Sequence, residues 1–296
     1  MNNDKSFLIK KKKIKILLTG GTGQLGRELK LDLSHLGSVW APKRSEFDLS
    51  NLQTVRKKIQ IYKPDLILNT AAFTNVEQAE AEPDLARIIN AYAPKVMAEE
   101  ANKLNITLIH ISTDYVFDGK NKIPYCEVDK PNPLNVYGKT KLEGEKYIKI
   151  IHDKYLILRT GWVYSSTGGK NFYQTISKLL KQKKKINVVK DQIGSPTSVK
   201  FLSQKIIQII NQINLKQNNE KRWGLYHLTE TEAMSWYQFA LKIYKKQAYD
   251  INTIKKKIVP VDSKLYPSLV KRPKFSVLNT TRIEYNFGLN LKNLNI

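Results

Sequence analysis

Tyr137 and Lys141 stand four residues apart in the run NVYGKTKLEGE at 135–145. In a helix, two side chains at this spacing lie on the same face. A free tyrosine has a pKa of about 10, so it is a useful acid–base catalyst only where a positive charge stabilises its phenolate. We expect Lys141 to lower the pKa of Tyr137, which could then protonate a carbonyl oxygen as the carbon accepts hydride. The alternative is a chance pair on an exposed helix.

A hydroxyl that could hold the same oxygen lies upstream. The apolar stretch 105–111 predicts a buried strand, and the polar run STDYVFDG at 112–119 follows it. Thr113 therefore comes at the carboxyl end of a strand, where ligands bind in open parallel sheets. Thr113, Tyr137 and Lys141 together form a candidate catalytic set.

The glycine-rich run TGGTGQLG at 19–26 predicts a phosphate site. A short apolar strand at 14–19 precedes it, and a helix from Gln24 to about Leu36 follows. Such a turn directs backbone N–H groups and the positive end of a helix dipole toward a phosphate. The sequence predicts that Gly20, Gly23 and Gly26 make room for a pyrophosphate and for close packing of the helix. An ordinary strand-to-helix turn is the alternative.

Two further strand ends indicate which dinucleotide cofactor such a fold would bind. The expected second strand, 37–41, is followed by Lys43 and Arg44 and by no acid. An acid at this position would bind the adenosine ribose and disfavour a 2′-phosphate, so the sequence favours NADPH, with NADH possible. The alternative is that both residues are ordinary surface cations. The third strand, 66–72, ends in Ala71 and Ala72, whose small side chains would let a ring or ribose approach the backbone.

Short apolar strands alternate with helices along the chain, which indicates an α/β fold: a Rossmann-type doubly wound parallel sheet with a smaller α/β C-terminal substrate-binding region. We predict a basic N-terminal arm (1–13), a dinucleotide-binding domain (14–160 and about 186–215) and a substrate-binding domain (about 161–185 and 216–296).

Composition narrows the class of protein. The chain has 296 residues and only Cys126 as a cysteine, which excludes an internal disulfide and favours a reducing cytoplasm. No apolar run is long enough for a signal peptide or a membrane span, so we expect a cytoplasmic protein without membrane insertion. The net charge of +24 would suit nucleic acid, but the lysines are spread along the chain and not interleaved with aromatic residues. We expect no specific nucleic-acid partner and an anionic substrate.

The motifs together resemble the extended short-chain dehydrogenase/reductase superfamily, and within it the dTDP-4-dehydrorhamnose reductase family. Besides the runs quoted above, the likeness rests on PDLILNTAAFTNVEQAE at 64–80, LRTGWVY at 158–164 and DQIGSPT at 191–197. It covers nearly the whole chain. The resemblance implies NADPH-dependent reduction of the C4 keto group of a dTDP-6-deoxy sugar, with Tyr137 as the proton donor.

The resemblance also implies roles for individual residues. The cofactor would be bound by Gly20, Gly23, Gln24, Leu25, Gly26, Arg44, Asp48, Leu49, Ala71, Ala72, Thr74, Tyr137 and Lys141. The substrate would be bound by Thr113, Asp114, Trp162 and Asn171. The chain lacks the family's usual last amphipathic helix, and no residues match the carboxylates that bind a metal in some relatives, so we identify no metal site; a homodimer is possible.

Three other functions share this fold. One is an NADP-binding regulatory subunit, as in the beta subunit of methionine adenosyltransferase, and another is a related sugar-nucleotide reductase. An epimerase or dehydratase is the third, although dehydratases usually have a second acid beside the position of Asp114. The presence of Thr113, Tyr137 and Lys141 favours an enzyme over a regulatory subunit.

Overall fold

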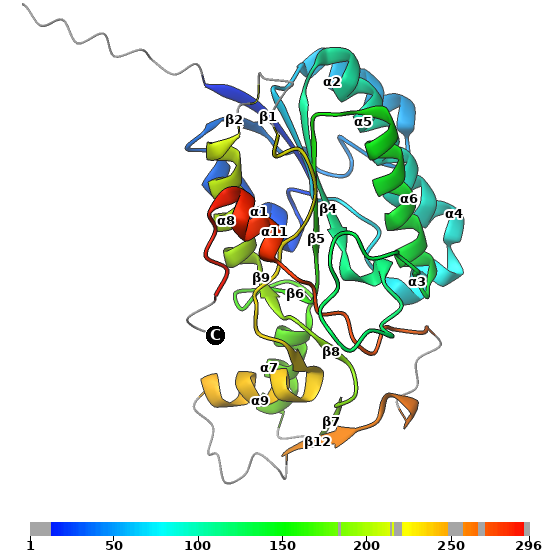
Figure 1. The fold of residues 1–296 in the computed structure, drawn as a ribbon, viewed down its shortest axis with the longest axis vertical. Helices are drawn as coiled ribbons and strands as arrows, with labels where there is room; N and C mark the ends of the chain where they lie inside the picture. The colour runs from blue at the N-terminus through cyan, green and yellow to red at the C-terminus, as the bar shows by residue number, and fades with distance from the viewer. Residues whose placement is uncertain are drawn as a thin grey trace, which may run out of the picture.

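A six-stranded parallel sheet forms the centre of the computed structural model, which describes residues 13–182, 185–213, 215, 221–247, 257–265 and 270–292 (Figure 1). All of the predicted basic arm except Lys13 lies outside these residues. The strands are, in spatial order, β10 (Gly224–His227), β5 (Tyr155–Thr160), β4 (Thr107–Thr113), β3 (Leu66–Asn69), β1 (Ile14–Thr19) and β2 (Gly37–Trp40). The direction of winding reverses between β1 and β3, where such sheets bind ligands at the carboxyl edge.

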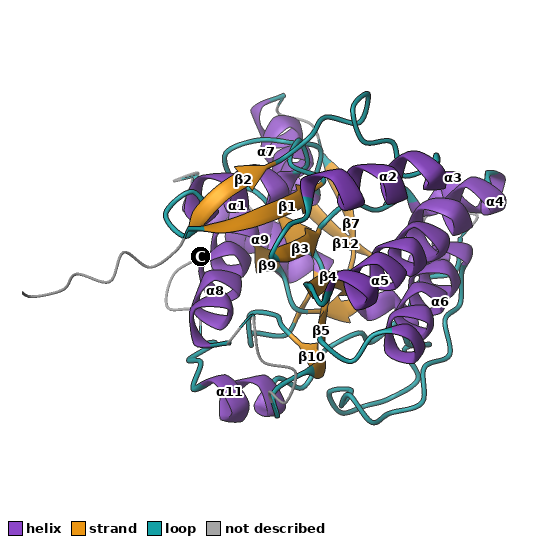
Figure 2. Ribbon diagram, turned by 90° about the horizontal axis from the view of Figure 1, so that it is seen from above, coloured by secondary structure: helices purple, strands orange, loops and turns teal. Residues whose placement is uncertain are grey.

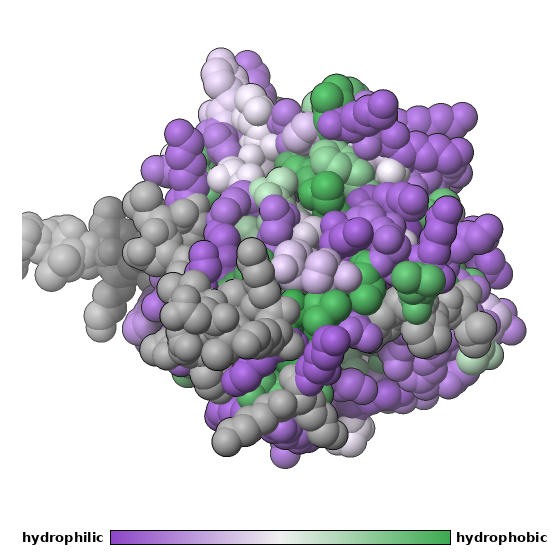
Figure 3. All heavy atoms as spheres, turned by 90° about the horizontal axis from the view of Figure 1, so that it is seen from below, coloured by the Kyte–Doolittle hydropathy of each residue, from purple (hydrophilic) through white to green (hydrophobic). Residues whose placement is uncertain are grey.

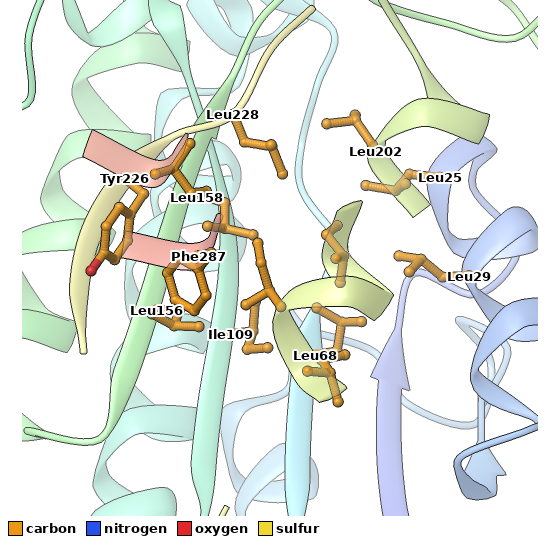
Figure 4. Packing of buried hydrophobic residues seen from close by; sticks show 14 of the residues in the cluster. Leu25, Leu29, Leu68, Ile109, Leu156, Leu158, Leu202, Tyr226, Leu228 and Phe287 are labelled. Atoms are coloured by element: carbon orange, nitrogen blue, oxygen red, sulfur yellow. The ribbon is translucent and has the colours of Figure 1, made fainter. Parts of the chain in front are cut away.

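Helices cover both faces of the sheet, which explains why its inner strands are apolar runs and not alternating patterns (Figure 2). One face carries α1 (Gln24–Leu33), α8 (Val199–Gln212) and α11 (Thr281–Phe287). The other carries α2 (Leu52–Tyr62), α5 (Ala93–Leu104) and α6 (Val136–Ile151). On the first face, Leu29, Leu202 and Phe287 belong to one buried cluster with Ile109 and Leu156 of the sheet (Figure 4).

The connection from β3 to β4 is mostly helical. It contains α3 (Val76–Ala81), α4 (Pro83–Arg87) and a π-helical turn (Ile88–Tyr92) that leads into α5. A 3₁₀ turn (Asp114–Val116) follows β4. The π turn matters for the site because it places Asn90 against the loop that follows β3.

A smaller region lies beyond the carboxyl edge of the sheet, at the bottom of Figure 1. Its elements are α7 (Phe172–Lys181), α9 (Trp236–Lys246), β7 (Ile186–Val189), β12 (Ile258–Val261), a 3₁₀ turn (Ser263–Leu265) and the short strands β6 (Val163–Tyr164), β8 (Ile193–Gly194), β9 (Thr197–Ser198) and β11 (Met234–Ser235). It has its own core, which includes Ile176, Phe239 and Ile258. Seen from this end, the surface is mostly hydrophilic, with separate apolar stretches (Figure 3).

The predicted fold class is confirmed, and the structure differs from the sequence reading in two places. β7 pairs in parallel with the distant β12 and not with the six-stranded sheet, so 186–189 lie with the smaller region and not where we placed them. The division into two domains otherwise stays a proposal. The sequence analysis gave no element for residues 281–287, which form α11, because Ile283 and Phe287 are buried and Phe287 packs on Tyr226, with ring centroids 5.4 Å apart.

Candidate active site

A cleft of about 700 Å³ opens at the carboxyl ends of β1, β3, β4 and β5. The structure brings all but two of the predicted site residues to this one cleft: Gly20, Gly23, Gln24, Leu25, Arg44, Asp48, Leu49, Ala71, Ala72, Thr74, Thr113, Asp114, Tyr137, Lys141 and Trp162. Gly26 and Asn171 do not line it. Residues far apart in the chain therefore meet where the strand order reverses.

The glycine turn between β1 and α1 is shaped to admit a phosphate. Gly20 has φ +72°, and a Cβ there would lie 2.8 Å from the backbone nitrogen of Ala71. Gly23 is the N-cap of α1 and no side chain caps the helix, so first-turn N–H groups are left for a ligand. A Cβ on Gly26 would lie 2.1 Å from the Gly20 carbonyl oxygen, so Gly26 lets α1 pack on the turn instead of lining the cleft. These residues fit a dinucleotide pyrophosphate.

At the far end of the cleft lies the exposed Arg44, whose Nε is 3.9 Å from Asp48 Oδ1. The Ser50 N–H donates to Asp48 and lowers the pKa of that carboxyl, and Arg44 lowers it further. The guanidinium is exposed at this end of the cleft and could meet an anionic group there. No acid follows β2 directly, as the sequence indicates.

A residue that the sequence analysis missed fixes the loop after β3. Asn90 accepts a hydrogen bond from the Phe73 N–H (2.8 Å) and donates to the Phe73 carbonyl (3.1 Å) and to Thr140 Oγ1 on α6 (3.2 Å). It ties the backbone beside Ala72 and Thr74 to the helix that carries Tyr137. A π-helical turn has no clear sequence pattern, which is why Asn90 gave no signal.

Tyr137 lies in the first turn of α6, where Asn135 caps the helix by accepting from the Gly138 N–H (2.9 Å). Burial raises the pKa of Tyr137 to about 12; the Thr113 hydroxyl opposes this shift and the Asp114 carboxyl adds to it. The expectation that Lys141 lowers this pKa is therefore wrong for this arrangement. Tyr137 holds its proton at neutral pH.

The reason is where the lysine nitrogen lies. Lys141 Nζ donates to the Ile111 carbonyl (2.7 Å) and is 3.1 Å from His110 Nε2, both on β4. Burial lowers the pKa of Lys141 to about 8, with Glu145 opposing the shift. The side chain lines the cleft, but its nitrogen is bound by the strand beneath it.

Thr113 and Asp114 line the cleft at the carboxyl end of β4. Thr113 Oγ1 accepts from the Tyr115 N–H (3.1 Å) and is 3.1 Å from Asp114 Oδ1. Asp114 is buried, which raises its pKa to about 6 against the smaller effect of the Ser276 and Thr113 hydroxyls. A Cβ on Gly161 would lie 2.8 Å from the Asp114 carboxyl, so this acid packs on bare backbone.

Two indole rings line the cleft where it meets the smaller region. Trp162, at φ +49°, stacks on Trp236 with centroids 3.4 Å apart and planes 2° apart. Trp236 comes from the start of α9, far along the chain, and the sequence analysis did not select it. Asn171 instead caps α7 and donates to Gln24 Oε1 (2.6 Å), so it joins the smaller region to the glycine turn.

A second cavity, of about 1210 Å³, adjoins the cleft and shares Thr74, Val76, Tyr115 and Trp236 with it. Asn171 lines this cavity. Six cationic residues line it as well: Lys120, Lys170, Lys264, Lys271, Arg272 and Lys274. Arg272 is paired with Glu77, and Lys120 lies 4.0 Å from Asp118. The excess of positive charge favours an anionic group here.

Comparison with known proteins gives the family. The sequence model of the RmlD substrate binding domain matches residues 14–295. The chain belongs to this family. It is 38% identical over 279 residues to dTDP-4-dehydrorhamnose reductase of Escherichia coli K12, covering 93% of this chain and 92% of the relative.

Solved structures agree with this assignment. The dTDP-4-dehydrorhamnose reductase of Bacillus anthracis, crystallised with NADP, superimposes with a TM-score of 0.87 at 34% identity and 95% coverage of both chains. The dTDP-glucose 4,6-dehydratase DesIV of Streptomyces venezuelae, at 14% identity and a TM-score of 0.77 over 95% of this chain and 92% of its own, shares the fold. The two dTDP-4-dehydrorhamnose reductases confirm the predicted resemblance, the enzyme class (an oxidoreductase) and a nicotinamide cofactor.

For this RmlD-family chain, no helix in the described ranges is long and apolar enough to cross a membrane.

The sequence analysis overlooked side chains that lie on one strand or helix and contact a predicted site residue, or the backbone beside it, on another. Asn90 and Trp236 are two of them. Asn69 and His110, behind Lys141, are the others.

Proposed function

We propose that the chain reduces the C4 keto group of dTDP-4-dehydro-L-rhamnose with NADPH and so forms dTDP-L-rhamnose. One observation carries the proposal: Thr113, Tyr137 and Lys141 line the same cleft as the glycine turn. A phosphate-binding turn alone would suit any dinucleotide protein, but a buried tyrosine acid at the other end of the cleft suits carbonyl reduction. The names of the relatives support the choice of sugar.

In this mechanism, the hydroxyls of Thr113 and Tyr137 would hold the keto oxygen. NADPH, when bound, supplies the hydride that adds to C4. Tyr137 gives its proton to the oxygen, so the ketone becomes an alcohol and the tyrosine becomes a phenolate. Its raised pKa keeps Tyr137 protonated and ready to donate in this direction. Lys141 would hold the ribose of the cofactor, and solvent would return a proton to Tyr137.

The remaining predicted residues have consistent places in the proposal. Gly20, Gly23, Gln24 and Leu25 would bind the pyrophosphate, with Gly26 supporting them. Asp48 and Leu49 would flank the adenine, and Ala71, Ala72 and Thr74 the nicotinamide side. Asp114 and Trp162 would contact the sugar. The cations of the second cavity would bind the substrate's pyrophosphate, with Asn171 near the nucleotide.

We propose NADPH over NADH because Arg44 lines the adenosine end of the cleft and is exposed there. Replacing Arg44 with Asp should lower the ratio of kcat/KM for NADPH to that for NADH by about tenfold or more, since a 2′-phosphate would then face a carboxylate. Steady-state assays with both cofactors measure this ratio. An unchanged ratio would remove Arg44 from the cofactor site.

The decisive experiment is NADPH oxidation by the purified chain with dTDP-4-dehydrorhamnose, made in the same vessel by the upstream epimerase because the keto sugar is unstable. We expect stoichiometric formation of dTDP-rhamnose, identified by mass spectrometry. Reactions without the keto sugar are the control. NADPH binding without sugar-dependent oxidation would favour the alternative, an NADP-binding regulatory subunit. A cytoplasmic location, a possible homodimer and the two-domain division stay predictions.

A further inference from the structure

Three buried polar side chains cross the sheet in one row beneath the cleft. The strand register places Thr19 beside Asn69 and Asn69 beside His110. Thr19 is 2% exposed, and Asn69 and His110 are fully buried. The row ends at Lys141, whose Nζ is 3.1 Å from His110 Nε2. Buried polar groups in a sheet of this kind need partners, so the direction of each hydrogen bond can be worked out.

The orientation of the Asn69 amide is fixed at one end. The backbone N–H of Ala71 lies 3.2 Å from Asn69 Oδ1, and the hydroxyl of Thr19 lies 2.6 Å from the same atom. A backbone N–H can only donate, so the oxygen of the amide must be on this side. The NH₂ group therefore faces His110, with Nδ2 2.9 Å from the imidazole Nδ1.

This orientation selects one form of His110. The Asn69 NH₂ group can only donate, so Nδ1 of His110 must accept with its lone pair. A neutral imidazole then carries its single hydrogen on Nε2, and an imidazolium would direct a second hydrogen at the amide. The hydrogen on Nε2 faces the nitrogen of Lys141.

An ammonium group has three donors and no lone pair, so it cannot accept this hydrogen bond. A neutral amine can: its lone pair accepts from Nε2–H, and one of its hydrogens goes to the Ile111 carbonyl 2.7 Å away. Burial lowers the pKa of His110 well below its usual value and that of Lys141 to about 8, so the neutral amine that this hydrogen bond requires predominates above about pH 8. Of the other described ionisable groups, Glu145 acts on Lys141 and raises its pKa, but Glu145 is already paired with Arg159 of β5 at 2.7 Å. Tyr137 and Asp114 line the same cleft as Lys141.

We propose that His110 is a positioning residue for Lys141: it donates its Nε2–H to the lysine amine and thereby sets the pH at which that amine becomes charged. The relevance of this proposal to catalysis rests on the function proposed above. The direction of the hydrogen bond does not depend on that function. His110 does not line the cleft, and its effect is exerted only through Lys141.

The tautomer of His110 can be read directly by ¹⁵N NMR of the full chain labelled at histidine, without cofactor or substrate. The chain has four histidines, and two of them provide internal references. His152 Nε2 is 2.8 Å from the Ile106 carbonyl and so carries its hydrogen on Nε2. His227 Nδ1 is 3.1 Å from the Tyr125 carbonyl and so carries its hydrogen on Nδ1. Single His→Gln variants assign the signals.

We expect the pattern of His110 to match that of His152. A pattern that matches His227 would overturn the proposal, because Lys141 would then be the donor, and an imidazolium pattern would overturn it as well, because Nδ1 would then have no lone pair to accept from Asn69. This measurement needs no turnover, so it succeeds or fails independently of the proposed reaction.

The functional consequence is tested by the pH profile of kcat/KM. His110→Leu removes the donor and should raise the pKa of Lys141, moving the basic limb of the profile up by about one pH unit, the equivalent of one hydrogen bond. His110→Gln offers an amide N–H at similar reach and should restore the profile. His152→Gln is the matched control for loss of a buried histidine. If His110→Leu folds and its basic limb stays in place, the proposal is contradicted. If that variant does not fold, the NMR result on the unaltered chain alone decides the proposal.

Discussion

At the scale of single residues, the site is defined by how burial changes protonation. Tyr137 and Asp114 are both acids whose pKa is raised, one to about 12 and the other to about 6. For Tyr137, the result is a proton donor that is loaded at neutral pH. For Asp114, the result is a carboxyl that is costly to bury and is charged only above mildly acidic pH.

Replacing Tyr137 with Phe should lower kcat by about 10²- to 10⁴-fold, because a positioned general acid contributes about that much. The dissociation constant for NADPH should stay within about threefold, since the ring is retained. NADPH absorbance gives kcat and fluorescence titration gives the affinity. Tyr147 lies on the same helix, and its hydroxyl donates a hydrogen bond to Glu143. Tyr147→Phe is therefore the matched control and should change neither kcat nor the NADPH affinity. Near-normal kcat in the Tyr137→Phe variant would remove Tyr137 as proton donor.

Replacing Asp114 with Asn should stabilise the protein at neutral pH. The folded pKa lies above the ordinary value of 3.8, so the native state binds the proton more tightly than the unfolded state and loses stability as pH rises between about 4 and 6. Asn cannot ionise and escapes this loss, which corresponds to about 3 kcal/mol at pH 7.5. Urea unfolding at pH 4 and pH 7.5 should show the gain only at the higher pH.

Asp118→Asn is the control for the direction in which Asp114→Asn changes stability with pH. Hydrogen bonds to the carboxylate of Asp118, from the Lys120 N–H and the Asn132 amide, lower the pKa of that group despite some burial. Asp118→Asn should therefore destabilise the protein at pH 7.5 relative to pH 4, the opposite of Asp114→Asn. Equal changes at the two pH values for Asp114→Asn would mean that its charge is not the source of the effect. We expect Asp114→Asn to lose activity while it gains stability, as residues placed for function often do.

At the scale of elements, the unit that matters is β1, the glycine turn and α1. Gly26→Ala adds a Cβ that would lie 2.1 Å from the backbone oxygen of Gly20. The helix must move off the turn, so we expect a loss of about 1–3 kcal/mol in stability and at least roughly tenfold weaker NADPH binding. Thermal unfolding and fluorescence titration measure both. In Gly168→Ala the new Cβ meets no atom of the described residues within 4 Å, so this variant is the control. The same modest effect in both variants would contradict the packing argument.

The elements also show what could be predicted from the sequence and what could not. Apolar runs, glycines and helix periodicity depend on neighbouring residues, and they predicted the parallel sheet and a cleft that contains Tyr137 and Arg44. The pairing of β7 with β12, the stacking of Trp236 on Trp162 and the row that ends at His110 depend on which distant segments lie side by side. The protonation of Tyr137 depends on burial and on where the lysine nitrogen is bound, and helical spacing alone gave the wrong direction.

At the scale of the whole molecule, the net charge of +24 becomes meaningful when it is combined with the second cavity. Its six cationic side chains adjoin the cleft in which the keto sugar is proposed to react. Exposed charges act over about 10 Å at 0.1 M salt, so cations at the cavity should attract an anionic nucleotide, while distant lysines should contribute little at that ionic strength.

Raising the salt concentration from about 50 to about 500 mM should therefore raise KM for the dTDP-linked sugar by about tenfold and leave kcat nearly unchanged, because screening weakens encounter and binding but not the buried proton transfer. Lys271→Gln should raise KM at low salt and reduce the salt dependence, since it removes one of the cavity's cations. Lys57→Gln, on the exposed side of α2, changes the net charge equally and should do neither. If both variants shift KM alike, the attraction comes from the charge of the whole protein and not from this cavity. If KM does not change with salt concentration, substrate binding does not depend on these cations.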